Sequence, residues 1–293
     1  MRIKALLFAP AVLLGLQLLC VPAAAAEERE EQRVTLTTED GWNLNARYLK
    51  APEGAPTIVL IHTAKSDLTE WEPWFKPMKR HGFGYLAFDL RGHGNSFVRP
   101  DGSTTTWRAF SISGSDNEYN RMVRDVDAAL AYLSTNSVTA ANTVLAGSVL
   151  GANLAIKAAA INPEIPMVIA VSPVLNVNDV LSVNPLRAYG KKPLLIIAGA
   201  DRAKQYKEFQ LLNDIARMAC GKGNVTVMVE ARGFGPKLIT KYNARRVLDW
   251  IKHPRLPDLV EISTAAADGL EPGTTEQAEA PGEEEEEAGF PQD

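Results

Sequence analysis

Short apolar runs alternate with helical segments across the middle of the chain. Six runs are too short for helices and are apolar at nearly every position, which predicts strands buried on both faces: 57–62, 85–89, 143–146, 167–171, 193–198 and 225–229. Segments 34–37 and 42–48 flank the turn signal Glu39-Asp40-Gly41 and predict a hairpin. The pattern predicts an α/β fold with a mostly parallel central sheet and an N-terminal antiparallel hairpin.

Four segments carry helical periodicity between these strands. Apolar residues recur on one face from Met122 to Leu133, and Ser115 with Glu118 forms the expected capping box. Three more helices are expected over 150–160, 209–219 and 241–251. Because both faces of the sheet must be covered, we expect helices on both sides.

The first 26 residues have the three-part layout of a secretory signal peptide. Arg2 and Lys4 precede an apolar run over 5–19, and four alanines precede Glu27. The run is shorter than a membrane-spanning helix requires, which favours cleavage over an uncleaved anchor. Lipoprotein anchoring through Cys20 is disfavoured, because the bulky Leu19 precedes it. We therefore expect export to the periplasm or the extracellular space.

The last 37 residues differ from the rest in composition. Residues 257–293 hold twelve acidic and no basic residues, which predicts a disordered, solubilising acidic tail, whereas residues 27–256 form one domain with a net charge of +6. The basic residues of this domain form no dense stripe, so nucleic-acid binding is not expected. Two cysteines and four scattered histidines give no metal-ligand spacing, and no metal or other cofactor is predicted.

Several motifs after the predicted strands resemble one family. The loop Asp89-Leu90-Arg91-Gly92-His93-Gly94-Asn95-Ser96 follows one strand, and 147–151, 172–173 and 197–201 follow others. Their order and spacing over 34–252 resemble the α/β-hydrolase fold family of serine hydrolases. The resemblance implies a Ser-His-Asp triad at the carboxyl ends of the strands. It also makes His93 a loop-packing residue and not the catalytic base.

The nucleophile position implied by the resemblance lacks a serine. The G-x-S-x-G turn of the family is here Gly147-Ser148-Val149-Leu150-Gly151, with Val149 at its centre. Ser148 stands one place early. On an extended strand end that shift turns a side chain to the opposite face. Ser148 therefore remains only a fallback nucleophile.

The base and the acid also depart from the family pattern. Pro236 stands where the histidine is expected, in Gly233-Phe234-Gly235-Pro236-Lys237, and proline cannot transfer a proton. The only histidine after the G-x-S-x-G turn, known as the nucleophile elbow, is His253, at the end of the last predicted helix. The acid position falls on Arg202, with Asp201 adjacent and available either after a small shift or as a helix cap.

The backbone of an oxyanion hole does not depend on these side chains. The N–H groups of Thr63 or Ala64 and of Leu150 are predicted to converge on an anion, as in the family. Segment 97–114, with Trp107 and Phe110, is expected to cover the crevice above Val149. The sequence thus favours a non-catalytic pseudo-hydrolase that binds a small molecule or peptide, or serves as a protein-interaction scaffold. The alternative is an active ester or acyl hydrolase with displaced residues such as Ser148.

Overall fold

The computed structural model describes residues 29–254. The predicted signal peptide, Cys20 and the acidic tail lie outside the described residues, so they stay predictions. Within 29–254, no helix is both long enough and apolar enough to cross a bilayer.

An eight-stranded sheet forms the centre of the molecule, in the order β1-β2-β4-β3-β5-β6-β9-β10. The β1–β2 hairpin is antiparallel, β2 pairs antiparallel with β4, and the other neighbours are parallel. The mostly parallel sheet and the N-terminal hairpin confirm the predicted fold class. The strands are β1 (Glu31–Thr37), β2 (Asn43–Leu49), β3 (Thr57–Ile61), β4 (Gly84–Phe88), β5 (Thr143–Ser148), β6 (Met167–Val171), β9 (Leu194–Gly199) and β10 (Val225–Glu230).

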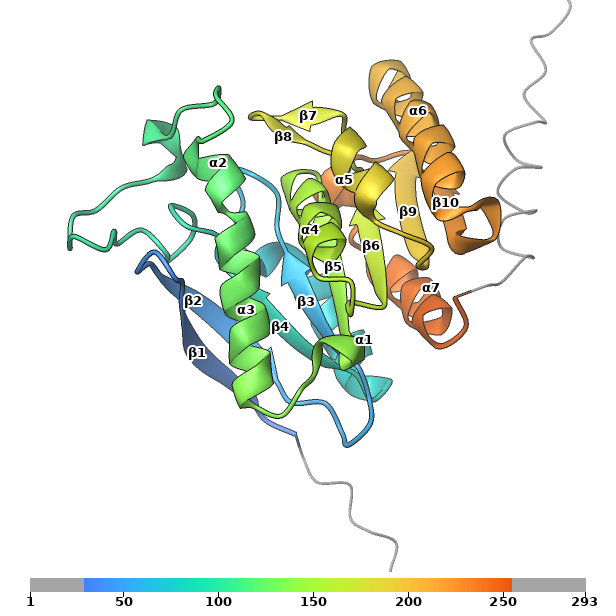
Figure 1. Ribbon diagram of the computed structural model, residues 1–293. Helices are drawn as coiled ribbons and strands as arrows, with labels where there is room; N and C mark the ends of the chain where they lie inside the picture. The colour runs from blue at the N-terminus through green and yellow to red at the C-terminus, as the bar shows by residue number, and fades with distance from the viewer. Residues whose placement is uncertain (1–28, 255–293) are drawn as a thin grey trace, which may run out of the picture.

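Helices cover both faces of this sheet, as Figure 1 shows. One face packs against α3, α4, α5 and α6, and the other against α1 and α7. The α-helices are α1 (Glu72–Arg80), α2 (Glu118–Arg121), α3 (Val123–Thr135), α4 (Leu150–Ile161), α5 (Val183–Ala188), α6 (Ala203–Cys220) and α7 (Lys241–Lys252). Because both faces are covered, β3 and β4 are buried at every position, which explains why their sequences are almost entirely apolar.

Several short elements were not predicted from the sequence. A small hairpin of β7 (Asn176–Val177) and β8 (Val180–Leu181) lies outside the main sheet. Five 3₁₀ turns connect the larger elements within the described residues: η1 (Leu68–Trp71), η2 (Trp107–Ala109), η3 (Ala140–Asn142), η4 (Lys222–Asn224) and η5 (Gly235–Leu238). Such short turns carry too few residues for a periodic signal.

The predicted capping box at Ser115 is wrong. The first helix of this segment starts at Glu118, and Asn117 is its N-cap, with its side chain accepting a hydrogen bond from the Asn120 N–H at 2.8 Å. The backbone is extended at Asn117, which places the cap two residues later than expected. Asparagine is as good an N-cap residue as serine, and it is at Asn117 that the extended backbone allows the cap.

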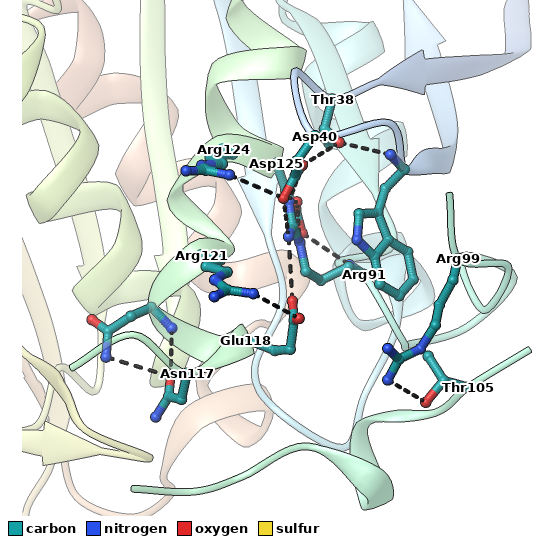
Figure 2. A network of polar contacts seen from close by, with 12 residues as sticks. Thr38, Asp40, Arg91, Arg99, Thr105, Asn117, Glu118, Arg121, Arg124 and Asp125 are labelled. Carbon is teal, nitrogen blue, oxygen red and sulfur yellow. Dashed lines mark hydrogen bonds and ion pairs between the residues drawn. The ribbon is translucent and has the colours of Figure 1, made fainter. Parts of the chain in front are cut away.

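A buried ion-pair network fixes the loop after β4 (Figure 2). The Arg91 side chain is fully buried and contacts Asp40, Glu118 and Asp125. Asp125 also accepts a hydrogen bond from the Arg91 backbone N–H at 2.9 Å. Removing one partner of such a pair leaves a buried charge without compensation. The network joins the hairpin turn, the loop after β4 and α3 on the side of the sheet where β1 and β2 lie.

Candidate functional site

The turn between β5 and α4 has the geometry of a nucleophile elbow. Val149 has φ 48° and ψ −99°, a conformation that costs a β-branched residue roughly 1–3 kcal/mol. A Cβ at Gly147 would lie 2.0 Å from the Gly151 carbonyl oxygen, and one at Gly151 would lie 2.0 Å from the Ile61 oxygen. The two glycines therefore permit the tight strand-turn-helix, and the valine is partly exposed at its tip.

Ser148 lies beneath this turn and not on it. It is the last residue of β5, it pairs with Val171, and it is fully buried. By the alternation of the strand it shares a face with Val144 and Ala146, whose side chains pack on the side of α1 and α7. Its hydroxyl is inaccessible to solvent and makes no hydrogen bond within the described part of the chain.

The loop that carries the base position returns to the elbow. The Gly235 N–H donates a hydrogen bond to Ser172 Oγ at 2.8 Å, and a Cβ at Gly235 would lie 2.8 Å from Val149 Cγ2. Pro236 follows in η5 and is exposed. His253 lies at the exposed end of α7. The loop is thus in place for a catalytic histidine, but the residue at that position has no group that transfers a proton.

The acid position lies beside the same loop. Asp201 is exposed, and its Oδ1 accepts a hydrogen bond from the Gly233 N–H at 3.0 Å. The suggestion that Asp201 caps the next helix is wrong, because Arg202 is the N-cap of α6 and no side chain caps that helix. The Arg202 guanidinium lies 5.5 Å from the centre of the Phe234 ring. Both residues therefore hold the base loop, and neither orients a histidine.

Of the three backbone N–H groups predicted to form an oxyanion hole, two have no hydrogen-bond partner among the described residues. The Thr63 N–H donates to Glu70 Oε2 at 3.2 Å. The N–H groups of Ala64 and Leu150 make no hydrogen bond to another described residue, and no side chain caps α4. The close packing of Gly151 against the Ile61 carbonyl brings the chain after β3 beside the first turn of α4. Unpaired N–H groups at a helix start attract anions.

Glu70, in η1, was not singled out from the sequence. Burial raises the pKa of its carboxyl group to about 7, with a smaller contribution from Asp67, while the Ser148 hydroxyl, the Thr63 N–H and Ser66 limit the rise. Ser148 is close enough to affect this ionisation, yet Ser148 Oγ and Glu70 Oε1 do not meet hydrogen-bond geometry. A glutamate at the start of a helix is common, so no local signal marks it.

Two buried histidines support the loops around the elbow. His62 donates from Nδ1 to the Thr63 carbonyl at 2.6 Å and accepts at Nε2 from the Leu90 N–H at 3.0 Å. His93 donates from Nδ1 to the Arg91 carbonyl at 2.9 Å. Burial lowers the pKa of each to about 4, so both rings are neutral at pH 7. This geometry is that of residues that hold loops.

Two surface cavities among residues 29–254 lie away from the elbow. One, of about 520 Å³, is lined by charged residues around Asp40, Glu118 and Arg121, next to the network in Figure 2. The other, of about 320 Å³, lies between the hairpin turn and α3. Val149 lines neither of them. Within the same residues, no group of three or more potential metal ligands comes together.

Comparison with known proteins agrees with this geometry. The family described as serine aminopeptidase, S33 (Hydrolase_4), matches residues 52–214, more than half of the chain. A 2-succinyl-6-hydroxy-2,4-cyclohexadiene-1-carboxylate synthase is 37% identical over 59 residues, in both Salmonella paratyphi B and Salmonella enteritidis. Those residues are 20% of this chain and 23% of either synthase, so the chain spans about a quarter of the length of these relatives.

Solved structures of hydrolases share the fold. An esterase of Pyrococcus furiosus superposes with a TM-score of 0.59 at 20% identity, over 76% of this chain and 91% of the esterase. A 2,6-dihydroxy-pseudo-oxynicotine hydrolase gives 0.60 at 14% identity, over 79% and 70%. The dienelactone hydrolase of Anabaena variabilis gives 0.57 at 15% identity, over 77% and 98%. At these identities the likeness concerns the fold alone. With the matched family segment, the strand order and the elbow geometry in agreement, the chain belongs to the serine aminopeptidase S33 family of α/β hydrolases.

Proposed function

We propose that this protein is a non-catalytic member of its family that binds a ligand at the elbow. The observation that carries the proposal is Val149 at the tip of the elbow, in the strained conformation that presents a nucleophile in active serine hydrolases. A valine side chain cannot attack a carbonyl carbon. The strain persists without the chemistry because the packing of Gly147 and Gly151 imposes the turn.

The base loop supports the same conclusion. It is held against the elbow by Ser172 and Asp201, but it presents Pro236 where a proton must be taken up. Triad members act as a unit, so a protein that lacks both nucleophile and base retains only binding and oxyanion stabilisation. Val149 is partly exposed, and the N–H groups of Ala64 and Leu150 have no partner among the described residues, which is compatible with such a binding role.

A fluorophosphonate probe and short-chain nitrophenyl esters test this proposal on the purified protein. The probe labels a serine only when a base activates it and an oxyanion hole stabilises the adduct. We expect neither labelling nor ester hydrolysis above an unrelated-protein control. The variant Val149→Ser with Pro236→His, and Arg202→Asp where needed, is the positive comparison, because it restores the family pattern at the same loops.

An active hydrolase with a displaced nucleophile is the competing function. The observation in its favour is the Glu70 carboxyl group beside the Ser148 hydroxyl, with a pKa near 7 that suits a general base. The complete burial of Ser148 counts against it. Stoichiometric labelling of the unmodified protein that is abolished by Ser148→Ala would establish this alternative and refute the non-catalytic function.

We also propose that the protein is exported. The charged start, apolar run and alanine-rich end of residues 1–26 support this, and the proposal rests on the sequence alone. Cell fractionation followed by N-terminal sequencing tests it. A mature chain that begins at Glu27 outside the cytoplasm is the expected result, and an intact N-terminus in the cytoplasm would refute it.

A further inference from the structure

Basic residues from four separate parts of the chain meet around Phe83, which directly precedes β4. The Arg29 guanidinium donates to the Phe83 carbonyl at 2.8 Å and to the Lys50 carbonyl at 3.2 Å. It also donates to the Lys79 carbonyl in the last turn of α1. Lys252 Nζ, at the end of α7, lies 5.6 Å from the centre of the Phe83 ring. These contacts define a basic cluster, whose members are Arg29, Lys50, Lys79, Arg80 and Lys252.

The side chains of this cluster have no carboxylate partner in the described part of the chain. None of the five forms an ion pair with another residue of 29–254. Arg29 is partly buried, and the other four are exposed. Their charges therefore face solvent and are available to an acidic partner.

The acidic groups nearby do not neutralise the cluster. Glu31 and Glu72 are both bound to Arg47. Glu30 and Glu53, which are close to cluster members in the sequence, are exposed and form no ion pair with a described residue. The C-terminal ends of α1 and α7 each add roughly half a negative charge. Two carboxylates and two helix ends are fewer negative charges than the five positive ones, so the cluster stays net positive.

The described chain ends beside this cluster. Pro254 is two residues beyond Lys252, and the predicted acidic tail begins three residues later. Residues 257–293 hold twelve acidic and no basic residues, with five consecutive glutamates at 283–287. In a segment predicted to be disordered, about 30 residues span roughly 30 Å, so this glutamate run stays within reach of the cluster. Tethering of this kind gives an effective concentration in the millimolar range, without any strong contact.

We propose that the acidic tail, residues 257–293, docks on the basic cluster of the same chain. The glutamates at 283–287 supply the densest counter-charge, and tethering makes a weak electrostatic contact intramolecular. The cluster lies at the amino end of β4, whereas the elbow follows the carboxyl end of the parallel strand β5. The docked tail therefore leaves the elbow open, and the proposal is independent of the non-catalytic function.

Carbodiimide cross-linking of the purified protein with its tail, followed by peptide mass spectrometry, tests this contact. The reagent joins a carboxylate to a lysine that touches it. We expect cross-links from residues 283–287 to Lys50 and Lys79 severalfold more often than to Lys204 and Lys207, which are exposed on α6. Raising the salt concentration from about 20 mM to about 500 mM should remove them, because screening weakens contacts between exposed charges. Equal cross-linking of both lysine pairs, or cross-links that resist salt, would overturn the proposal.

Two other occupants of the cluster are distinguished by the same protein. A cross-link yield that rises with protein concentration would assign the cluster to the tail of a second copy, and would overturn docking within one chain. Sedimentation with phosphatidylglycerol vesicles, without cross-links from the tail, would assign the cluster to an anionic membrane surface. We expect a concentration-independent yield and no more sedimentation with these vesicles than with phosphatidylcholine vesicles.

Variants of the tail and of the cluster separate charge from other effects. Substituting glutamine for all five glutamates at 283–287 should shift the amide resonances of Lys79 and Arg80 to their positions at high salt, whereas aspartate at the same places should not. Lys79→Met with Arg80→Met should reduce cross-linking to Lys50 severalfold, and the matched pair Lys204→Met with Lys207→Met should leave it unchanged. Cross-linking to Lys50 that is unaffected by the loss of Lys79 and Arg80 would refute the cluster as the docking site.

Discussion

Val149 and Gly235 pack against each other across the elbow, so closely that a Cβ at residue 235 would lie 2.8 Å from Val149 Cγ2. The contact joins the turn after β5 to the loop after β10. It fills the space directly above the nucleophile position with a valine methyl group. The loop after β10 therefore lies directly against the elbow, and an apolar contact stands where the family resemblance implies a serine and histidine pair.

This contact predicts a measurable coupling between the two positions. Gly235→Ala should destabilise the protein by about 1–3 kcal/mol, because the new methyl group overlaps Val149 and the φ of 56° disfavours alanine. Adding Val149→Ala removes the overlap, so the double variant should recover part of the loss. Urea denaturation of the two single variants and the double variant gives the coupling energy. Strict additivity would show that the two residues do not interact.

The second glycine of the elbow should be irreplaceable. A Cβ at Gly151 would lie 2.0 Å from the Ile61 carbonyl oxygen, and the two backbone segments cannot move apart without disturbing the carboxyl ends of the central strands β3 and β5. We expect Gly151→Ala to lower the free energy of unfolding by about 3 kcal/mol or more. Gly223→Ala is the matched control, because nothing lies within 4 Å of its Cβ position. Thermal denaturation of both variants compares them, and equal melting temperatures would contradict the elbow geometry.

Glu70 should make stability depend on pH. Its pKa rises from 4.5 to about 7 on folding, so its contribution is fully present below about pH 4.5 and is lost as pH rises through 7. The glutamine introduced by Glu70→Gln stays neutral at every pH. The variant should therefore gain about 2–3 kcal/mol on the unmodified protein between about pH 4.5 and pH 8. Urea denaturation across this range measures the difference, and a pH-independent difference would refute it.

The contribution of Asp40 to stability should depend on pH in the opposite direction to that of Glu70. Burial alone would raise the pKa of the Asp40 carboxyl group. Hydrogen bonds from Arg91 and Thr38, together with the charge of Arg91, outweigh burial and lower this pKa to about 2. Its stabilisation is present above pH 3.8 and is lost as pH falls toward 2. Asp40→Asn should cost about 1 kcal/mol at neutral pH, allowing for screening at this partly exposed site.

In acid, the free energy of unfolding of Asp40→Asn should approach that of the unmodified protein, because Asp40 itself becomes neutral there. Chemical denaturation at about pH 7, 4 and 2.5 follows the convergence. Glu39→Gln serves as the control, because Glu39 is the exposed neighbour of Asp40 and forms no ion pair with a described residue. A cost of Asp40→Asn that is the same at all three pH values would argue against an ionic contribution.

The fold could be predicted from the sequence because it depends on local patterns of apolar residues and glycines. Strands buried on both faces are apolar at nearly every position, and β3, β4 and β6 are, with Thr57 in β3 as the polar exception. The glycines at 147 and 151 stand at the spacing that a tight strand-turn-helix requires, so the elbow could be placed before its dihedral angles were known. The predictions that were wrong concerned local choices between similar residues, as with the cap at Asn117 and the capping role suggested as one alternative for Asp201.

The sequence by itself determined the fold class and the position of the elbow. It also placed Val149 and Pro236 where the family resemblance implies a nucleophile and a base. Only the tertiary structure decided which groups surround them. Glu70 accepts a hydrogen bond from the Thr63 N–H and lies near the Ser148 hydroxyl, 78 positions away in the sequence, because η1 packs against β3 and β4. Apolar periodicity is a local property of the chain, whereas burial, and with it the pKa of Glu70, arises only when distant segments exclude water together.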